Sequence, residues 1–172
     1  LQEVQSGDTV IVTSGSAIQK GDGSGGLTAA TAGTDYVAVG TASTFTATQT
    51  FSGSTSTLAE VITNGAEVAT VSATAATGTI NYDVTTQSVL YYTTNASGNW
   101  TVNFRASSGT ALNTAMSTGQ SVTVVFLVSQ GSTAYYNNAV TVDGNAVTPK
   151  YQGGSAWTQG NASGIDAYSY TI

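Results

Sequence analysis

Carboxylates and Tyr hydroxyls are the only acid–base groups that this chain offers in number. Its 172 residues include nine Asp and Glu, three Lys and Arg, no His and no Cys. Thiolate, imidazole and zinc–thiolate chemistry is therefore excluded, whereas a glycoside hydrolase needs only two facing carboxyl groups. The carboxylates belong to Glu3, Asp8, Asp22, Asp35, Glu60, Glu67, Asp83, Asp143 and Asp166.

These carboxylates occupy positions that are typical of surface groups. Asp143 sits in an Asp-Gly turn, and Asp83 points away from its apolar neighbours in an alternating run. Glu60 and Glu67 fall on polar faces around a predicted hairpin. Carboxylates outside any motif are most often solvated. The sequence therefore predicts no catalytic residue and a chain that is not an enzyme.

The Gly-rich residues 21–26, with the sequence GDGSGG, could suggest a phosphate-binding loop or a calcium-binding repeat. No Lys and Ser/Thr pair follows the last Gly, and a single copy supplies too few oxygen ligands for calcium. The segment is therefore predicted to be a flexible joint. The sequence predicts no metal site and no cofactor.

Aromatic side chains are the best candidates for contacts with a ligand. Trp157 lies in a Gly-rich loop near Tyr151 and has no obvious core partner in the sequence. Tyr135 and Tyr136 are adjacent in an extended run, so at least one of them reaches an outer face. Such groups either stack on sugar rings or pack in cores and subunit contacts, and both interpretations stay open.

Charge narrows the possible partners. The formal net charge is -6 and charged residues make up 7% of the chain, so phosphate neutralisation by clustered Lys and Arg is excluded. No run approaches the roughly 18 consecutive apolar residues of a membrane span. The sequence predicts no nucleic-acid partner and no membrane insertion.

Residues 54–172 are predicted to position these groups on an all-β domain. Short alternating runs recur between turn residues, which is typical of an antiparallel β-sandwich or jelly roll. Asn64-Gly65 between two apolar runs predicts a β-hairpin. Residues 121–129 are apolar on both faces and predict a central strand, and residues 165–172 predict the last strand. Residues 111–116 are the one predicted helical turn.

Residues 1–53 differ because they hold few bulky apolar side chains. A short strand is predicted at residues 8–13, and Phe45 and Phe51 flank a run of alternating Thr at residues 44–51. Such a segment cannot bury a core of its own. It is predicted to be an extended, oligomerising stem or linker that intertwines with other copies of itself.

Two stretches resemble a known group of proteins. Residues 21–36, GDGSGGLTAATAGTDY, resemble linkers in tailed-bacteriophage fibre proteins. The segments NWTVNFR at 99–105, GQSVTVVFLV at 119–128, YQGG at 151–154 and GNASGIDAY at 160–168 are similar to a module of marine phage and cyanophage virion proteins. In that module the third segment is commonly Trp-Gln-Gly-Gly, and here Tyr151 replaces the Trp.

The resemblance implies a homotrimeric, non-enzymatic tail fibre component located on the virion. Its expected partners are other copies of itself, other virion proteins and a host-surface glycan, to which it would attach the particle. Trp157, Tyr151, Tyr135 and Tyr136 are the expected ligand contacts. Two alternatives stay open: a capsid decoration or assembly protein without receptor binding, and a fibre-borne glycan depolymerase.

Overall fold

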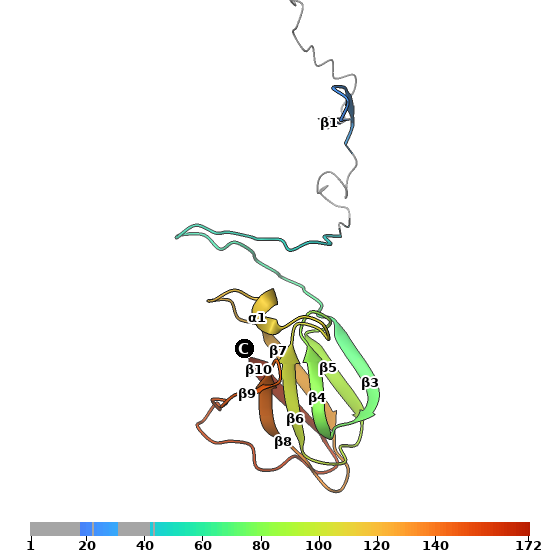
Figure 1. Ribbon diagram of the computed structural model, residues 1–172, viewed down its shortest axis with the longest axis vertical. Helices are drawn as coiled ribbons and strands as arrows, with labels where there is room; N and C mark the ends of the chain where they lie inside the picture. The colour runs from blue at the N-terminus through green and yellow to red at the C-terminus, as the bar shows by residue number, and fades with distance from the viewer. Residues whose placement is uncertain (1–17, 22, 31–41, 43) are drawn as a thin grey trace, which may run out of the picture. The chain divides into compact units, whose positions relative to one another are not determined.

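A computed structural model describes residues 18–21, 23–30, 42 and 44–172 (Figure 1). The chain divides into two units, Leu1–Ile62 and Thr63–Ile172. The strand predicted at residues 8–13 lies outside the described residues. The predicted division after residue 53 stays a prediction, and the first strand of the larger unit begins at Ala69.

The described part of the first unit contains one short hairpin. β1 (Gln19–Gly21) pairs antiparallel with β2 (Leu27–Ala29), and Ala30 N donates to Ile18 O over 2.7 Å. The Gly-rich stretch that was predicted to be a flexible joint lies between these two paired strands, and its Asp22 lies outside the described residues. Gly23 and Gly25 have φ angles of 83° and 89°, a conformation that Gly adopts without steric cost. The intertwined stem stays a prediction.

The second unit is a sandwich of two four-stranded sheets. Sheet I has the order β10-β7-β5-β3, and sheet II has the order β4-β6-β8-β9. The strands of sheet I are β3 (Ala69–Ala75), β5 (Val89–Thr94), β7 (Thr123–Ser129) and β10 (Ile165–Thr171). The strands of sheet II are β4 (Gly78–Asp83), β6 (Trp100–Arg105), β8 (Asn137–Val142) and β9 (Asn145–Ala146).

The all-β prediction is confirmed, but the antiparallel, jelly-roll-like arrangement is wrong. β3 and β5, β5 and β7, β4 and β6, and β6 and β8 all pair in parallel. Only β7 with β10 and β8 with β9 are antiparallel among these strands. From β3 to β8 the chain changes sheet after every strand, so neighbours within a sheet run in the same direction. The predicted turns therefore connect layers, whereas a jelly roll connects antiparallel neighbours.

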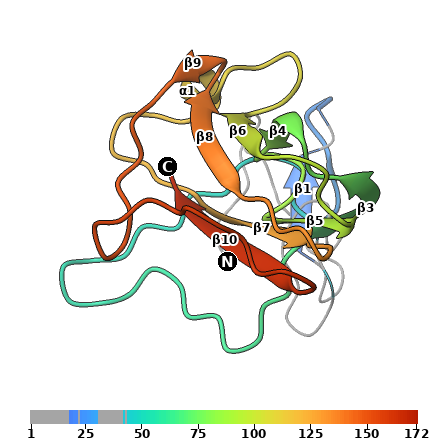
Figure 2. The ribbon, with the colours of Figure 1, turned by 90° about the horizontal axis from the view of Figure 1, so that it is seen from below.

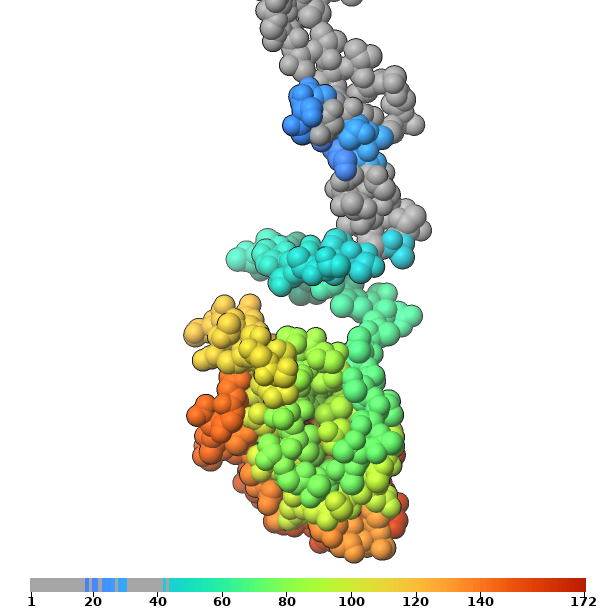
Figure 3. Space-filling model, turned by 45° about the vertical axis from the view of Figure 1, so that its right-hand side comes forward, coloured from blue at the N-terminus to red at the C-terminus, as the bar shows by residue number. Residues whose placement is uncertain are grey.

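The core lies between the two sheets. Trp100 of β6 meets Phe126 of β7 and Tyr168 of β10 edge-on, with ring centroids 6.1 and 5.5 Å apart. The Tyr82 hydroxyl of β4 donates to the carbonyl oxygen of Val125 in β7 over 3.1 Å. The largest fully buried side chains come from both sheets: Trp100, Tyr82, Phe104, Phe126, Val102, Val124 and Val128. Figure 3 shows one side of this unit, with the green atoms of its first strands at the surface.

The predicted hairpin at Asn64-Gly65 is wrong. The residues before the turn form no strand, and neither turn residue has a positive φ angle, which a type I′ turn needs. β3 pairs in parallel with β5 instead. By contrast, Asp143 and Gly144 have φ angles of 50° and 78° and do connect the antiparallel strands β8 and β9.

The predicted helical turn and the predicted central strand are confirmed. α1 (Leu112–Ala115) is a single turn between β6 and β7, and β7 lies inside sheet I. In the part of the chain that the structure describes, no helix has the length and apolarity to cross a membrane.

The two sheets differ in their outer faces. In sheet I, Val71, Tyr91, Leu127 and Ala167 are paired in one outward row across four strands. In sheet II, the corresponding outward row is Asn81, Asn103 and Thr141. The central row of the sheet I face is therefore apolar, with hydroxyl residues such as Thr123 and Thr171 toward its end, and the corresponding row of sheet II is polar.

Candidate ligand-binding cleft

A cleft of about 410 Å³ opens at the side of the sandwich where β8 and β10 lie. The loop of residues 147–164 joins β9 to β10 (Figure 2). This loop contributes Val147 and Pro149 to the lining, among other residues. This volume falls in the lower part of the range for small-molecule sites. Its lining residues are Phe104, Val140, Val142, Val147, Pro149, Lys150, Tyr151, Gln152, Trp157, Ala167, Ser169, Tyr170, Thr171 and Ile172.

The loop places Trp157 and Tyr151 side by side in the cleft. Their ring centroids are 5.2 Å apart and their planes meet at 83°. Trp157 also packs against Tyr168 and Tyr170 of β10, at 4.8 and 5.8 Å. The expectation that Trp157 lacks a core partner is therefore wrong, because β10 presents two rings to it. Both Trp157 and Tyr151 remain partly exposed.

Tyr170 brings a buried hydroxyl to this cleft. Its side chain lines the cleft and is 8% exposed, and its hydroxyl has no hydrogen-bond partner among the described residues. Burial raises the pKa of Tyr170, so the hydroxyl stays protonated and can donate. An unpartnered buried polar group costs about 1–3 kcal/mol. A ligand oxygen at this point would remove that cost.

A network of polar groups fixes the far end of the loop. The buried Asp166 carboxylate accepts from Gln130 Nε2 over 2.9 Å and from Asn161 N over 3.2 Å. Gly160 lies within this network, and a Cβ there would clash with the Tyr135 carbonyl oxygen and with Asp166. The sequence therefore needs Gly at this position so that the loop can approach β10 closely.

Tyr135 and Tyr136 do not join the cleft. Tyr135 packs partly buried against the core, and its backbone exchanges hydrogen bonds with the Gln130 side chain. Tyr136 N donates to Asn99 Oδ1 over 3.0 Å at the start of β6. Of the four predicted ligand contacts, the structure brings together only Trp157 and Tyr151.

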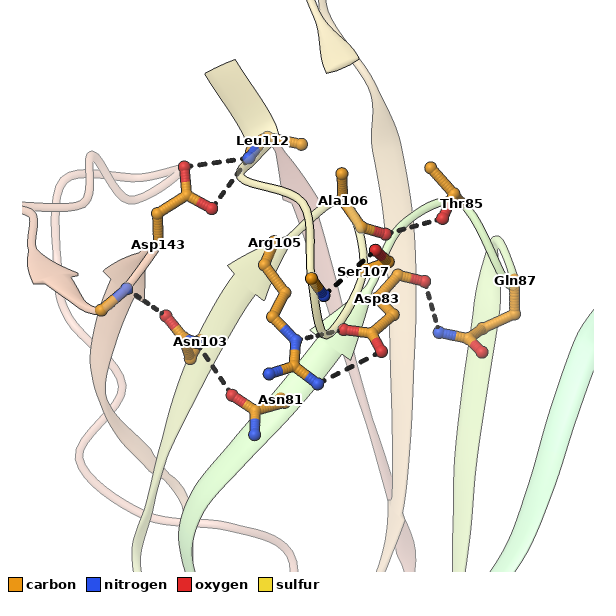
Figure 4. Close-up of polar contacts among 12 residues, drawn as sticks. Asn81, Asp83, Thr85, Gln87, Asn103, Arg105, Ala106, Ser107, Leu112 and Asp143 are labelled. Atoms are coloured by element: carbon orange, nitrogen blue, oxygen red, sulfur yellow. Dashed lines mark hydrogen bonds and ion pairs between the residues drawn. The ribbon is translucent and has the colours of Figure 1, made fainter. Parts of the chain in front are cut away.

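The carboxylates of Asp83, Asp143 and Asp166 serve structural contacts. Asp83 pairs with Arg105, and the Asp143 carboxylate accepts from Leu112 N over 2.8 Å (Figure 4). No Asp or Glu side chain belongs to the lining of the cleft. Among the described residues, no three Asp or Glu come together as metal ligands. Glu3, Asp8, Asp22 and Asp35 lie outside the described residues.

The cleft combines an aromatic wall with polar groups that can bind oxygen atoms. Tyr151 and Trp157 supply ring surface, and Lys150 and Gln152 supply donors. The Tyr170 hydroxyl is a further donor, and it is buried in the structure without a ligand. Aromatic surface beside a few directed polar groups suits a ligand that is apolar on one face and carries hydroxyls on its edge. A saccharide ring has that character.

Known proteins offer no further guide to this site. No family model, no curated protein and no solved structure matches the chain.

Sequence reasoning missed Tyr170, Lys150 and Gln152. The alternation of Tyr168 and Tyr170 in the last strand predicts that both face the core, as they do. This alternation does not indicate that the Tyr170 hydroxyl lacks a hydrogen-bond partner. Whether the hydroxyl finds a partner depends on which segment of the chain covers the edge of the sandwich.

Proposed function

We propose that this chain is a structural component of a bacteriophage tail fibre, located on the virion, that attaches the particle to a saccharide of the host surface. Its action is binding and not turnover, and it works as a homotrimer together with other virion proteins. The sequence resemblance supports the virion role. The observation that carries the binding role is the aromatic cleft with the unpartnered Tyr170 hydroxyl.

The chemistry of the cleft favours binding over hydrolysis. Glycoside hydrolysis uses two carboxyl groups across the scissile bond, and the lining of the cleft contains neither Asp nor Glu. Weak saccharide contacts repeated on several copies would give avidity, so modest affinity at one cleft suffices for attachment.

The test is a binding titration of the full chain against a panel of immobilised oligosaccharides of defined sequence, both neutral and acidic. Trp157→Ala is expected to reduce binding at least about tenfold, since it removes the largest ring from the cleft. Tyr136→Ala serves as the control because Tyr136 lies outside the lining. A wild-type chain that binds nothing on the panel contradicts attachment to a saccharide.

Tyr170→Phe separates binding from packing. It removes only the unpartnered hydroxyl, so the folded chain should keep or gain stability. The affinity for a bound oligosaccharide should fall about fivefold, the value of one hydrogen bond. Unchanged affinity in this variant would show that ligands do not reach the hydroxyl.

A capsid decoration protein is the second candidate, and the apolar outer face of sheet I favours it. That face could pack against a shell without any receptor. Purified chain that binds capsids but no cells or oligosaccharides would favour this role.

A further inference from the structure

The outer face of sheet I carries no charge. Its four strands contain one charged residue, Asp166, and that side chain is 6% exposed and faces inward to Gln130 and Asn161. Outward lie Val71, Tyr91, Leu127 and Ala167 in one row, beside Val89 and Val125 in the next. The face therefore contributes nothing to the net charge of -6.

This face is exposed at both edges of the sheet. Val71 on β3 is 64% exposed and Ile165 on β10 is 58% exposed. Interface cores are depleted of charged residues, as this face is. Burying it desolvates no ion, whereas burying the outer face of sheet II would desolvate Asp83 and Arg105.

We infer that the outer face of sheet I is the surface through which copies of this chain associate. A charged partner would need charges on this face to complement, whereas further copies of this chain present a sheet I face that is equally free of charge. The inference deepens the proposed function and rests on it for the presence of further copies.

The size of the face shows that it does not act alone. The width of the face is four strands at about 4.8 Å spacing, and its length is about seven residues at 3.3 Å each. The area of the face is therefore roughly 400 Å². A stable interface buries about 800 Å² on each partner. The exposed Phe45, Phe51, Leu58, Val61 and Ile62 of the first unit offer further apolar area. Association is therefore expected to need both the face and the first unit.

The test is the solution mass of the full chain by light scattering across a concentration series. Val71→Glu with Ile165→Glu places a charge at each edge of the face, and both sites are exposed, so the monomer should fold. The matched control is Thr79→Glu with Ala139→Glu, two exposed outward positions of sheet II with the same added charge. The first variant should raise the dissociation constant about 100-fold or more, and the control should match the wild type.

The possible outcomes separate two failures. If the wild type is an oligomer and the variant Val71→Glu with Ile165→Glu keeps the same mass, the face of sheet I is not the association surface. The proposed function is unaffected by that result. A wild type that is monomeric at every concentration overturns both the face and the trimeric fibre component. Loss of association in both double variants also overturns the face, because the effect would then follow from net charge.

Discussion

The outer faces of the two sheets have the same strand geometry, but their central rows differ in polarity. On sheet II, Asn103 donates to Asn81 and accepts from Gly144 N, each over 2.8 Å (Figure 4). Asn103 also accepts from the Thr141 hydroxyl over 2.8 Å. On sheet I, the matching row is apolar, and Tyr91 contributes only a 3.4 Å contact to Ser129. The polar ladder is satisfied within one chain, whereas the apolar face gains from being covered. The difference indicates which surface is complete in the monomer.

The largest difference should appear between two neighbouring residues of β7. Phe126 is fully buried between the sheets and meets Tyr92 with ring centroids 5.1 Å apart, so Phe126→Ala should cost about 3–5 kcal/mol. Leu127 points outward, and Leu127→Ala should cost about 1 kcal/mol in dilute solution. Urea unfolding at two protein concentrations measures both. Equal costs in dilute solution would show that the outer face packs within the monomer.

The polar ladder of sheet II should affect folding without affecting association. Asn103 is 9% exposed and makes three hydrogen bonds, so Asn103→Ala should cost about 1–3 kcal/mol. Asn81 ends the ladder at an exposed position, and Asn81→Ala should cost less. Unfolding curves give the stabilities, and light scattering gives the mass. A change of mass in Asn103→Ala would place sheet II in the interface.

Alkaline pH should weaken the core that the two faces share. Burial raises the pKa of Tyr82 and of Tyr168 to about 12, from an ordinary value of 10. The unfolded chain therefore releases these protons first, so their contribution is complete below pH 10 and is lost as the pH rises toward 12. The loss is on the order of 2 kcal/mol for each group. Unfolding free energies measured across this range should fall, and a flat profile would contradict burial of these rings.

The smallest effect is expected at the ion pair of sheet II. Arg105 and Asp83 are each about a quarter exposed, and the hydrogen bond to Asp83 raises the pKa of Arg105. Arg105→Gln should lower the stability slightly at low salt and not at high salt, because salt screens exposed pairs. Denaturation midpoints at two salt concentrations measure this. A large loss that persists in high salt would show that Arg105 has a further structural role.

The sequence predicted the strands better than their pairing. The alternation of Val124, Phe126 and Val128 identified β7, and the Asp143-Gly144 turn was also recognised. Local patterns fix which side chains share a face. They do not fix which strands become neighbours, because a short turn can lead either within a sheet or across the core. The predicted hairpin at Asn64-Gly65 is wrong for the same reason. The residues before this turn form no strand, and β3, which follows it, pairs with β5.

The cleft was only partly predictable. Trp157 and Tyr151 were expected as ligand contacts from their types and their loop, and the structure places both in one cleft. The roles of Tyr170 and Gly160 depend on how residues 147–164 cover the edge of the sandwich. That path is a tertiary property, set by contacts of Asp166 with Gln130 and Asn161, and no local pattern specifies it.

The most direct test of the difference between the two faces uses the absence of Cys from this chain. Val71→Cys and Thr79→Cys each introduce one thiol at an exposed outward position, on sheet I and on sheet II. The measurement is the rate at which a maleimide modifies each thiol in the full chain at high protein concentration. Our account predicts slow modification at position 71, accelerated by dilution, and fast modification at position 79 at every concentration. Equal, concentration-independent rates at the two positions would contradict it.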